Sequence, residues 1–230
     1  MELDHVWFDC NGTLYALTPD ITARRDNHVC SKISALLKRP ESEVRTRFQQ
    51  GRKEYGTRLS SIKNMFGLSA LDASDIAQGA DITDLLNPDP LLNEALICLK
   101  QKNLDISIYT NDSRPELFAV LSKLGVDLTM FKYMMTNEEG GGKPSGFDEV
   151  IVRSKCDPFE LMFVGDSERA DIAPARRLGM NTLLVGAEAL GIERDIEHDE
   201  KFGTYHFRRK AVYEVVSVVE SLGNLGFKFS

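Results

Sequence analysis

A carboxylate stands where the first apolar run of the chain gives way to a turn. Asp9 follows the run HVWF at positions 5–8, and Asn11-Gly12, a strong turn signal, comes directly after it. Aspartate is one of the side chains that accept a phosphoryl group covalently, and one at the end of a strand can meet a ligand. An aspartate beside a turn is, however, more often a simple loop residue. Asp9 therefore indicates nucleophilic chemistry only if other residues complete a site.

A hydroxyl side chain follows a second apolar run, at positions 104–109. Thr110 and Asn111 come directly after this run, and a hydroxyl followed by backbone amides suits a phosphate oxygen. The competing interpretation is that Thr110 is the N-cap of a helix that begins near Arg114.

A lysine lies in the glycine-rich run GGGKP at positions 140–144. Lys143 can neutralise the charge of a transferring phosphoryl group, and the proline after it restrains the backbone. The alternative is a solvated loop lysine. The run is not a nucleotide-binding P-loop, because Asn137 stands where that motif needs its first glycine and Pro144 replaces its Ser or Thr.

Two further carboxylates follow a third apolar run, at positions 160–164. Gly165-Asp166 ends this run and Asp171 comes five positions after Asp166. Such a pair can supply oxygen ligands to a hard cation. Asp171 can instead lie in the first turn of the next helix, where the helix dipole favours a negative charge.

The elements that position these residues alternate between strand and helix patterns. Alternation of this kind predicts βαβ units and a parallel sheet, in which ligands bind beyond the carboxyl ends of the strands. We expect the loops at Asp9, Thr110, Lys143 and Asp166 to lie at that edge. The predicted strands are 5–9, 104–109, 131–135, 160–164 and 181–185, and the predicted helices are 91–102, 114–124, 145–154, 168–178 and 211–222.

A helical segment separates the first strand from the rest of this pattern. Val29, Ile33, Leu36 and Leu37 recur at helical spacing, and residues 16–87 as a whole are predicted to be mainly helical. The turn-rich stretch at positions 87–90 then predicts a hinge. The sequence therefore predicts a discontinuous α/β core, residues 1–15 and 88–230, with an inserted helical domain at 16–87.

The joint order Asp9, Thr110, Lys143, Asp166, each at a strand end, resembles the four motifs of the haloacid dehalogenase (HAD) superfamily. The resemblance implies a Rossmann-like core with an inserted helical cap. Within the cap, the stretch YGTRL at 55–59 and the later Asn87-Pro88-Asp89 resemble the pyrimidine 5'-nucleotidase branch, as does Leu14-Tyr15 after the first motif.

This resemblance implies a Mg²⁺-dependent phosphatase that acts on a small phosphate monoester, with nucleoside 5'-monophosphates as one class of substrate. Asp9 would be the nucleophile that forms an aspartyl phosphate. Thr110, Asn111 and Lys143 would bind the substrate, with Thr110 and Lys143 also catalytic. The Mg²⁺ ligands would be Asp9, Asn11 through its backbone carbonyl, Asp166 and Asp171.

Asn11 departs from the pattern, because phosphatases of the superfamily carry an aspartate there as general acid and base. Asparagine cannot donate a carboxylic proton, and acid-base assistance is typically worth about 10²- to 10⁴-fold. The protein is then either a weak natural enzyme or a substituted, slowed form, and Asn11→Asp is expected to restore the missing rate. Two alternatives stay open: a 2-haloacid dehalogenase, whose halide needs no proton to leave, and a catalytically impaired binding or regulatory protein on the same fold.

The composition argues against some classes of binding partner. The net charge of −7 argues against a nucleic-acid polymer, which needs clustered Lys and Arg. The 4 cysteines are scattered without a CxxC pair, which favours reduced thiols in a cytoplasmic protein. We expect no signal peptide and no membrane partner, because the chain lacks a long apolar run. The sequence does not indicate an oligomeric state.

Overall fold

The computed structural model describes residues 2–140, 142–186, 196–225 and 228–229. The chain divides into two compact units. The first unit contains Met1–Ala16 and Pro88–Ser230, and the second contains Leu17–Asn87. That the two units act as a catalytic core and a cap stays a prediction.

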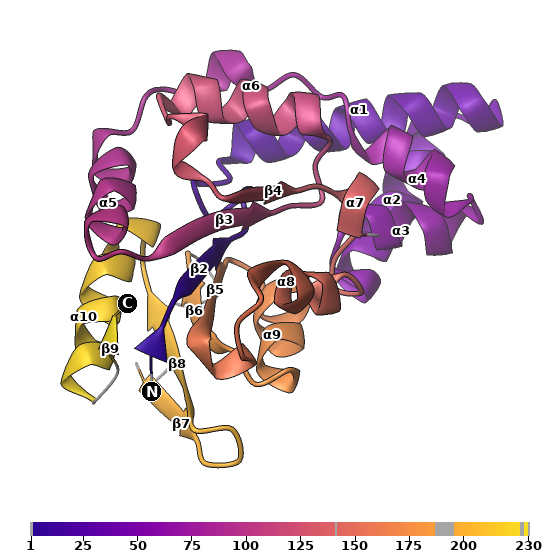
Figure 1. Cartoon of the computed structure of the whole chain (residues 1–230). Coiled ribbons are helices and arrows are strands. Elements are labelled where there is room, and N and C mark those ends of the chain that lie inside the picture. Colours follow the sequence, from indigo (N-terminus) through magenta and orange to yellow (C-terminus); the bar gives the residue numbers. More distant parts are fainter. Residues whose placement is uncertain (1, 141, 187–195, 226–227, 230) are drawn as a thin grey trace. The chain divides into compact units, whose positions relative to one another are not determined.

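The first unit is built on a seven-stranded sheet with the order β4-β3-β2-β5-β6-β8-β7 (Figure 1). Neighbouring strands are parallel except β7 and β8, which are antiparallel. The α/β prediction is therefore confirmed, and each of the five predicted strands lies in this sheet. The strands are β2 (His5–Phe8), β3 (Asp105–Tyr109), β4 (Tyr133–Met135), β5 (Leu161–Gly165), β6 (Asn181–Val185), β7 (Ile196–Asp199) and β8 (Thr204–Arg209).

Among the described residues, sequence patterns missed four strands. β7 and β8 extend the sheet at one edge, and their mixed polar sequences lack the continuous apolar run of a buried strand. β1 (Glu2–Leu3) pairs in parallel with β9 (Lys228–Phe229) in a separate two-stranded sheet. Pairs this short carry no periodicity that a sequence pattern can reveal.

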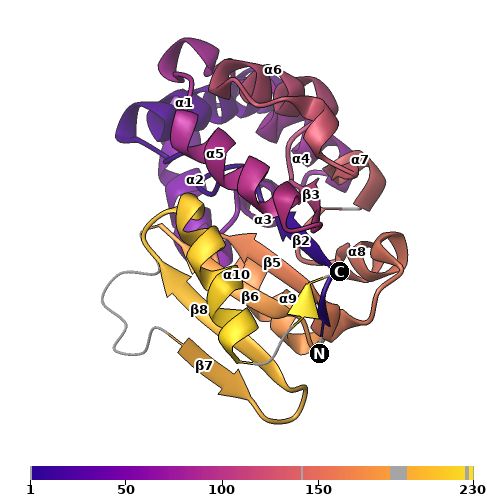
Figure 2. The same ribbon diagram turned by 60° about the vertical axis from the view of Figure 1, so that its left-hand side comes forward.

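Helices cover the sheet of the first unit on both sides. Figures 1 and 2 show α5 and α10 on one side of the sheet and α8 and α9 on the other. The predicted helix at 168–178 begins as a π-type turn, Glu168–Ile172, before α9. The α-helices are α5 (Pro90–Gln101), α6 (Arg114–Leu124), α7 (Asn137–Gly140), α8 (Phe147–Ser154), α9 (Ala173–Arg177) and α10 (Val215–Asn224).

Aromatic side chains fill the core between the sheet and α8. Trp7 is fully buried, stacks on His5 at 5.1 Å between ring centroids, and donates its indole N–H to Ser154 Oγ at 2.8 Å. Phe147 of α8 packs on Phe163 of β5 at 4.7 Å. Large aromatic rings contribute much of the apolar burial that stabilises a domain. This packing holds β2 and β5 side by side, so the residues after these two strands lie close together.

The second unit is a helical domain with its own core. Val29 and Ile33 of α1 pack with Val44 and Phe48 of α2 and Ile62 of α3. Leu36 lies in α1 as its spacing predicted, but its side chain is 55% exposed and outside this core. The elements are α1 (Pro19–Leu37), α2 (Glu41–Tyr55), α3 (Arg58–Phe66), α4 (Ala70–Ala77) and the 3₁₀ turn Thr83–Leu85.

Side-chain caps set the start of three helices in the second unit. The hydroxyls of Thr18, Thr57 and Ser69 accept backbone N–H groups in the first turns of α1, α3 and α4, which satisfies donors that a helix leaves open. Across the described parts of the chain, none of the helices has the length and apolar character needed to cross a membrane.

Candidate active site

The loop after β2 holds Asp9 in a buried position. Its side chain is 5% exposed, and its backbone N–H donates to the Val164 carbonyl at 2.8 Å, which continues the pairing with β5. The Thr13 hydroxyl donates to Asp9 Oδ2 at 3.2 Å. Gly12, with φ of 85°, turns the chain so that Leu14 N–H reaches the Cys10 carbonyl at 2.9 Å. The turn thus aims the carboxylate inward.

Lys143 lies beside this carboxylate and is not a solvated loop lysine. Its Nζ donates to Asp9 Oδ1 and, at 2.7 Å, to Asp171 Oδ1, and the residue is 5% exposed. The ammonium group also lies 5.7 Å from the Tyr109 ring centroid and 5.6 Å from that of Phe163, distances at which a cation is attracted to an aromatic face. The four residues around it therefore hold Lys143 in one place.

The end of β5 brings in two more carboxylates. Asp171 is 1% exposed, and its Oδ2 accepts the Ser167 backbone N–H at 3.1 Å. This close approach needs Gly165, because a Cβ there would lie 2.4 Å from the Asp171 Cβ. Asp171 lies in the first turn of the π-type segment, as the dipole interpretation expected, and it also faces Lys143.

Asp9, Asp166 and Asp171 together form a group of the kind that holds a cation. Each offers a carboxylate oxygen, and these oxygens lie within 4.8 Å of one another. An all-oxygen donor set suits a hard divalent ion such as Mg²⁺ better than a soft metal. The residues present thus fit the cofactor that the sequence indicated.

The residues after β3 form the wall next to Lys143. Asn111 Oδ1 accepts the Lys143 backbone N–H at 2.7 Å. Thr110 is fully buried, and its hydroxyl accepts the Asp112 backbone N–H at 3.2 Å. Thr110 is not a helix N-cap, because Ser113 occupies that position of α6 and forms a capping box with Glu116.

Two side chains hold Asn11, one from the residues after β3 and one from the loop after β2. Its Nδ2 donates to Asp112 Oδ1 at 2.7 Å, and its Oδ1 accepts the Tyr15 hydroxyl. Sequence reasoning did not single out Asp112. The available signal was its position three residues beyond the end of β3, the same kind of strand-end position that identified Asp9 and Asp166.

Burial and ion pairing set the charges of the site. Burial raises the pKa of Asp9 above its usual value, the Lys143 ammonium opposes this increase, and the Asp171 carboxylate adds to it. Burial lowers the pKa of Lys143, but Asp171 and Asp9 raise it by more, so its net pKa lies above the usual value. Lys143 therefore stays positively charged and partly neutralises the carboxylates.

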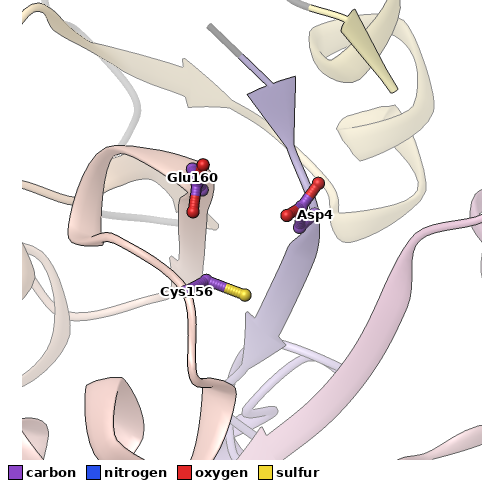
Figure 3. Close-up of side chains that lie close together, drawn as sticks. All are labelled: Asp4, Cys156 and Glu160. Carbon is purple, nitrogen blue, oxygen red and sulfur yellow. The ribbon is translucent and has the colours of Figure 1, made fainter. Parts of the chain in front are cut away.

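A second close group of side chains lies at the opposite ends of the strands. Asp4 precedes β2, and Cys156 and Glu160 precede β5 (Figure 3). Burial and the two nearby carboxylates raise the pKa of the Cys156 thiol. This group lies at the amino ends of β2 and β5, whereas Asp9 and Asp166 follow the carboxyl ends of these strands.

The fold and the site define a hydrolase of the HAD class. The family described as haloacid dehalogenase-like hydrolase matches residues 3–179. The chain belongs to this family, which confirms the class that the four strand-end residues indicated.

Relatives and a solved structure agree with this assignment. Over 228 residues the chain is 26% identical to a glyceraldehyde 3-phosphate phosphatase of Methanocaldococcus jannaschii, covering 94% of this chain and 97% of that protein. A protein of the same name from Methanothermobacter thermautotrophicus is 32% identical over 121 residues, 52% of this chain and about half (53%) of the relative. The crystal structure of a HAD phosphatase from Thermococcus onnurineus matches with a TM-score of 0.61 and 21% identity, covering 94% of this chain and 98% of that one. At this level of identity, the match to the Thermococcus onnurineus structure shows a shared fold.

Proposed function

We propose that the protein is a Mg²⁺-dependent phosphatase that hydrolyses a small phosphate monoester through an aspartyl phosphate on Asp9. The observation that carries this proposal is the cluster of Asp9, Asp166 and Asp171 beyond the carboxyl ends of parallel strands, in which Asp9 and Asp171 pair with the buried Lys143. Phosphoryl transfer needs a nucleophile, a cation site and a fixed positive charge in one place, and these four residues supply them.

The side chains would act as follows. A carboxylate oxygen of Asp9 attacks phosphorus, an Asp9 O–P bond forms, and the P–O bond to the alcohol breaks. Lys143 and Thr110 bind the phosphoryl oxygens and Asn111 orients the Lys143 backbone. Water then hydrolyses the aspartyl phosphate and restores the Asp9 carboxylate. Mg²⁺, held by Asp9, Asp166, Asp171 and the Asn11 backbone carbonyl, would neutralise charge on the phosphoryl group.

Asn11 limits the rate in this proposal. Its amide cannot protonate the departing alkoxide, so we expect turnover to be lower by about 10²- to 10⁴-fold than with a carboxylic acid at that place. Asn11 is also the observation that favours a second candidate, a 2-haloacid dehalogenase, because a halide leaves without a proton. A binding or regulatory protein that has lost turnover is the third possibility.

The substrate we propose is a small phosphorylated metabolite. The relatives named glyceraldehyde 3-phosphate phosphatase support a short phosphorylated sugar. Nucleoside 5'-monophosphates are the other class, suggested by the nucleotidase-like stretch at 55–59. Within that stretch Arg58 is paired with Asp26 of the same unit at 2.8 Å.

A substrate panel with matched controls tests the proposal. Glyceraldehyde 3-phosphate, nucleoside 5'-monophosphates and p-nitrophenyl phosphate would be assayed for phosphate release with Mg²⁺ and with a chelator, and 2-chloropropionate for chloride release. We expect phosphate release that needs Mg²⁺ and that Asp9→Asn abolishes. Chloride release without any divalent ion would favour the dehalogenase, and no turnover of either kind would favour the binding protein.

A further inference from the structure

The amide of Asn11 is clamped between a donor and an acceptor. Asp112 Oδ1 accepts the Asn11 Nδ2 proton at 2.7 Å, and the Tyr15 hydroxyl donates to Asn11 Oδ1. A carboxylate oxygen accepts hydrogen bonds, so the nitrogen end of the amide must face Asp112. The orientation of the Asn11 side chain is therefore fixed by its neighbours.

Asn11, Asp112 and Tyr15, which together form this clamp, are themselves fixed by their surroundings. Tyr15 is 8% exposed and Asp112 is 7% exposed. Asn11 and Tyr15 also form an isolated backbone bridge across the loop, and the Asp112 backbone is tied to the Thr110 hydroxyl at 3.2 Å. The clamp thus joins the loop after β2 to the loop after β3, the two loops that carry the nucleophile and the phosphate-binding residues.

We propose that Asp112 is the positioning residue for position 11, and that Asn11 and Asp112 form a matched pair in which an aspartate at position 11 requires an asparagine at position 112. The proposal rests on the function proposed above only for its consequence for turnover. Asn11→Asp would place two carboxylates at hydrogen-bond distance with no proton donor between them, and like charges in a buried place are costly.

The exchange variant Asn11→Asp/Asp112→Asn keeps both hydrogen bonds of the clamp, with the direction of one reversed. The amide at position 112 would donate to the carboxylate at position 11, and the Tyr15 hydroxyl would still find an acceptor. Asp112→Asn alone leaves an amide oxygen that can accept from Asn11. Asn11→Asp is therefore the mismatched member of the cycle, and the increase in turnover expected from an acid at position 11 needs the second change.

A double-mutant cycle measures this coupling without relying on activity. The full-length protein, both single variants and the exchange variant would be compared by thermal unfolding at neutral pH in a chelator. We expect Asn11→Asp to lower the unfolding midpoint by at least about 2–4 °C. Asp112→Asn should raise the midpoint when added to Asn11→Asp and should not raise it when added to the unchanged protein. A stabilising effect of Asp112→Asn that appears only beside Asn11→Asp would show that the two positions are coupled.

A matched control separates the pair from a general effect of negative charge. Asn111→Asp adds the same charge one residue from Asp112 and keeps an acceptor for the Lys143 backbone N–H. If Asp112→Asn rescued Asn111→Asp as well as it rescued Asn11→Asp, the matched pair would be refuted. An Asn11→Asp midpoint equal to that of the unchanged protein would refute it too. Where Asn11→Asp does not fold, a folded exchange variant supports the pair and an unfolded one overturns it.

An activity measurement gives an independent readout. With Mg²⁺ and p-nitrophenyl phosphate, kcat of the exchange variant should exceed that of Asn11→Asp by about 10-fold or more, with a smaller change in KM. Equal kcat values in two active variants would contradict the inference. If all four proteins released no phosphate from any ester, the proposed function would fail, whereas the unfolding cycle would still decide whether Asn11 and Asp112 are paired.

Discussion

At the scale of single residues, the site depends on the balance of charge around Lys143. Its ammonium group contacts Asp9 and Asp171, and all three residues are almost fully buried. Removing one partner of a buried ion pair is more costly than the pair is worth, because the remaining charge stays out of water. Lys143 would therefore stabilise the fold as well as the proposed reaction.

Replacing Lys143 by methionine tests both roles. We expect Lys143→Met to reduce phosphate release at least about 100-fold and to lower the free energy of unfolding by about 3–5 kcal/mol in a chelator. Mg²⁺ should raise the unfolding midpoint of this variant more than that of the unchanged protein, because a bound cation can replace the missing positive charge. Denaturant unfolding with and without Mg²⁺ measures this.

Lys132→Met is the matched control for that variant. Lys132 pairs with Asp105, but its side chain is 42% exposed, and exposed pairs contribute about 0–1 kcal/mol. We expect little change in stability, in the response to Mg²⁺ or in turnover. Equal losses in the two lysine variants would mean that the Lys143 ion pairs have no special role.

Asp9, Thr110 and Asp166 could be singled out from the sequence because each comes directly after a strand. Their joint order with Lys143, rather than any one of them alone, carried the resemblance to the HAD motifs, and their roles stay predictions. The role of Asp112 was not predictable, because its hydrogen bond to Asn11 joins loops that are 101 positions apart in the sequence. Partners of this kind depend on the order of strands in the sheet, which local patterns do not contain.

At the scale of elements, the junction between β5 and the π-type turn positions two carboxylates of the proposed cation site, Asp166 and Asp171. Gly165 has an ordinary backbone conformation, so a side chain there meets no backbone strain. The obstacle is the Asp171 side chain, whose atoms would lie 2.4–2.7 Å from an added Cβ. We expect Gly165→Ala to displace Asp171 and to reduce Mg²⁺-dependent phosphate release at least about 10-fold, since small displacements at an active site are costly.

Gly67→Ala gives the comparison for this variant. Gly67 ends α3 with φ of +66°, and nothing lies within 4 Å of an added Cβ. The strain of that backbone conformation should cost about 1 kcal/mol of stability without a change in turnover. Isothermal titration with Mg²⁺ and initial rates separate the two cases. Unchanged Mg²⁺ affinity in Gly165→Ala would show that Asp171 does not depend on the glycine.

The element predictions succeeded where burial gave a clear pattern. β6 and α6 have the predicted bounds, 181–185 and 114–124. β6 is a short buried run, and the buried apolar residues of α6 recur at helical spacing after a cap residue. β8 was missed because three of its six residues are only partly buried and its sequence ends in Arg208-Arg209. Pairing with β6 stabilises this strand, and a pairing partner is not visible in a local pattern.

At the scale of the whole molecule, the sheet places the first long strand of the chain among strands that come much later. β2 lies between β3 and β5, and its pairing brings His5 opposite Asp105 and Leu161. The sequence predicted a parallel sheet but not this order. Two histidines of this sheet, His5 in β2 and His206 in β8, are buried.

Burial sets the charge state of both histidines. Burial lowers the pKa of His5 to about 4, with Asp105 opposing the decrease and Lys132 and Lys100 adding to it. Burial also lowers the pKa of His206 to about 4; Arg176 and Arg208 act in the same direction, and Glu197 and Asp199 oppose them. The His5 ring is also hydrogen-bonded to Ser107 Oγ at 2.8 Å, and the His206 ring is hydrogen-bonded to Thr182 Oγ1 at 2.9 Å.

These two histidines should make the protein less stable in mild acid. In the unfolded chain each histidine has a pKa of about 6.5, whereas in the folded protein each has a pKa of about 4. Between these two pH values the unfolded state therefore binds protons that the folded state does not bind. The stabilisation is therefore fully present above about pH 6.5 and is lost as the pH falls toward about 4. Linkage gives a loss of about 2 kcal/mol per histidine between about pH 7 and about pH 5.

Glutamine variants measure this contribution, because glutamine keeps a hydrogen-bonding group and does not titrate. The free energy of unfolding would be determined in urea between about pH 7 and about pH 5 for the unchanged protein, His5→Gln, His206→Gln and the double variant. Each replacement should make the decrease shallower by about 2 kcal/mol, even if it lowers stability at neutral pH. His198→Gln, at an exposed position of β7, controls for the loss of a histidine as such. A decrease in the double variant as steep as in the unchanged protein would assign the acid sensitivity to other groups.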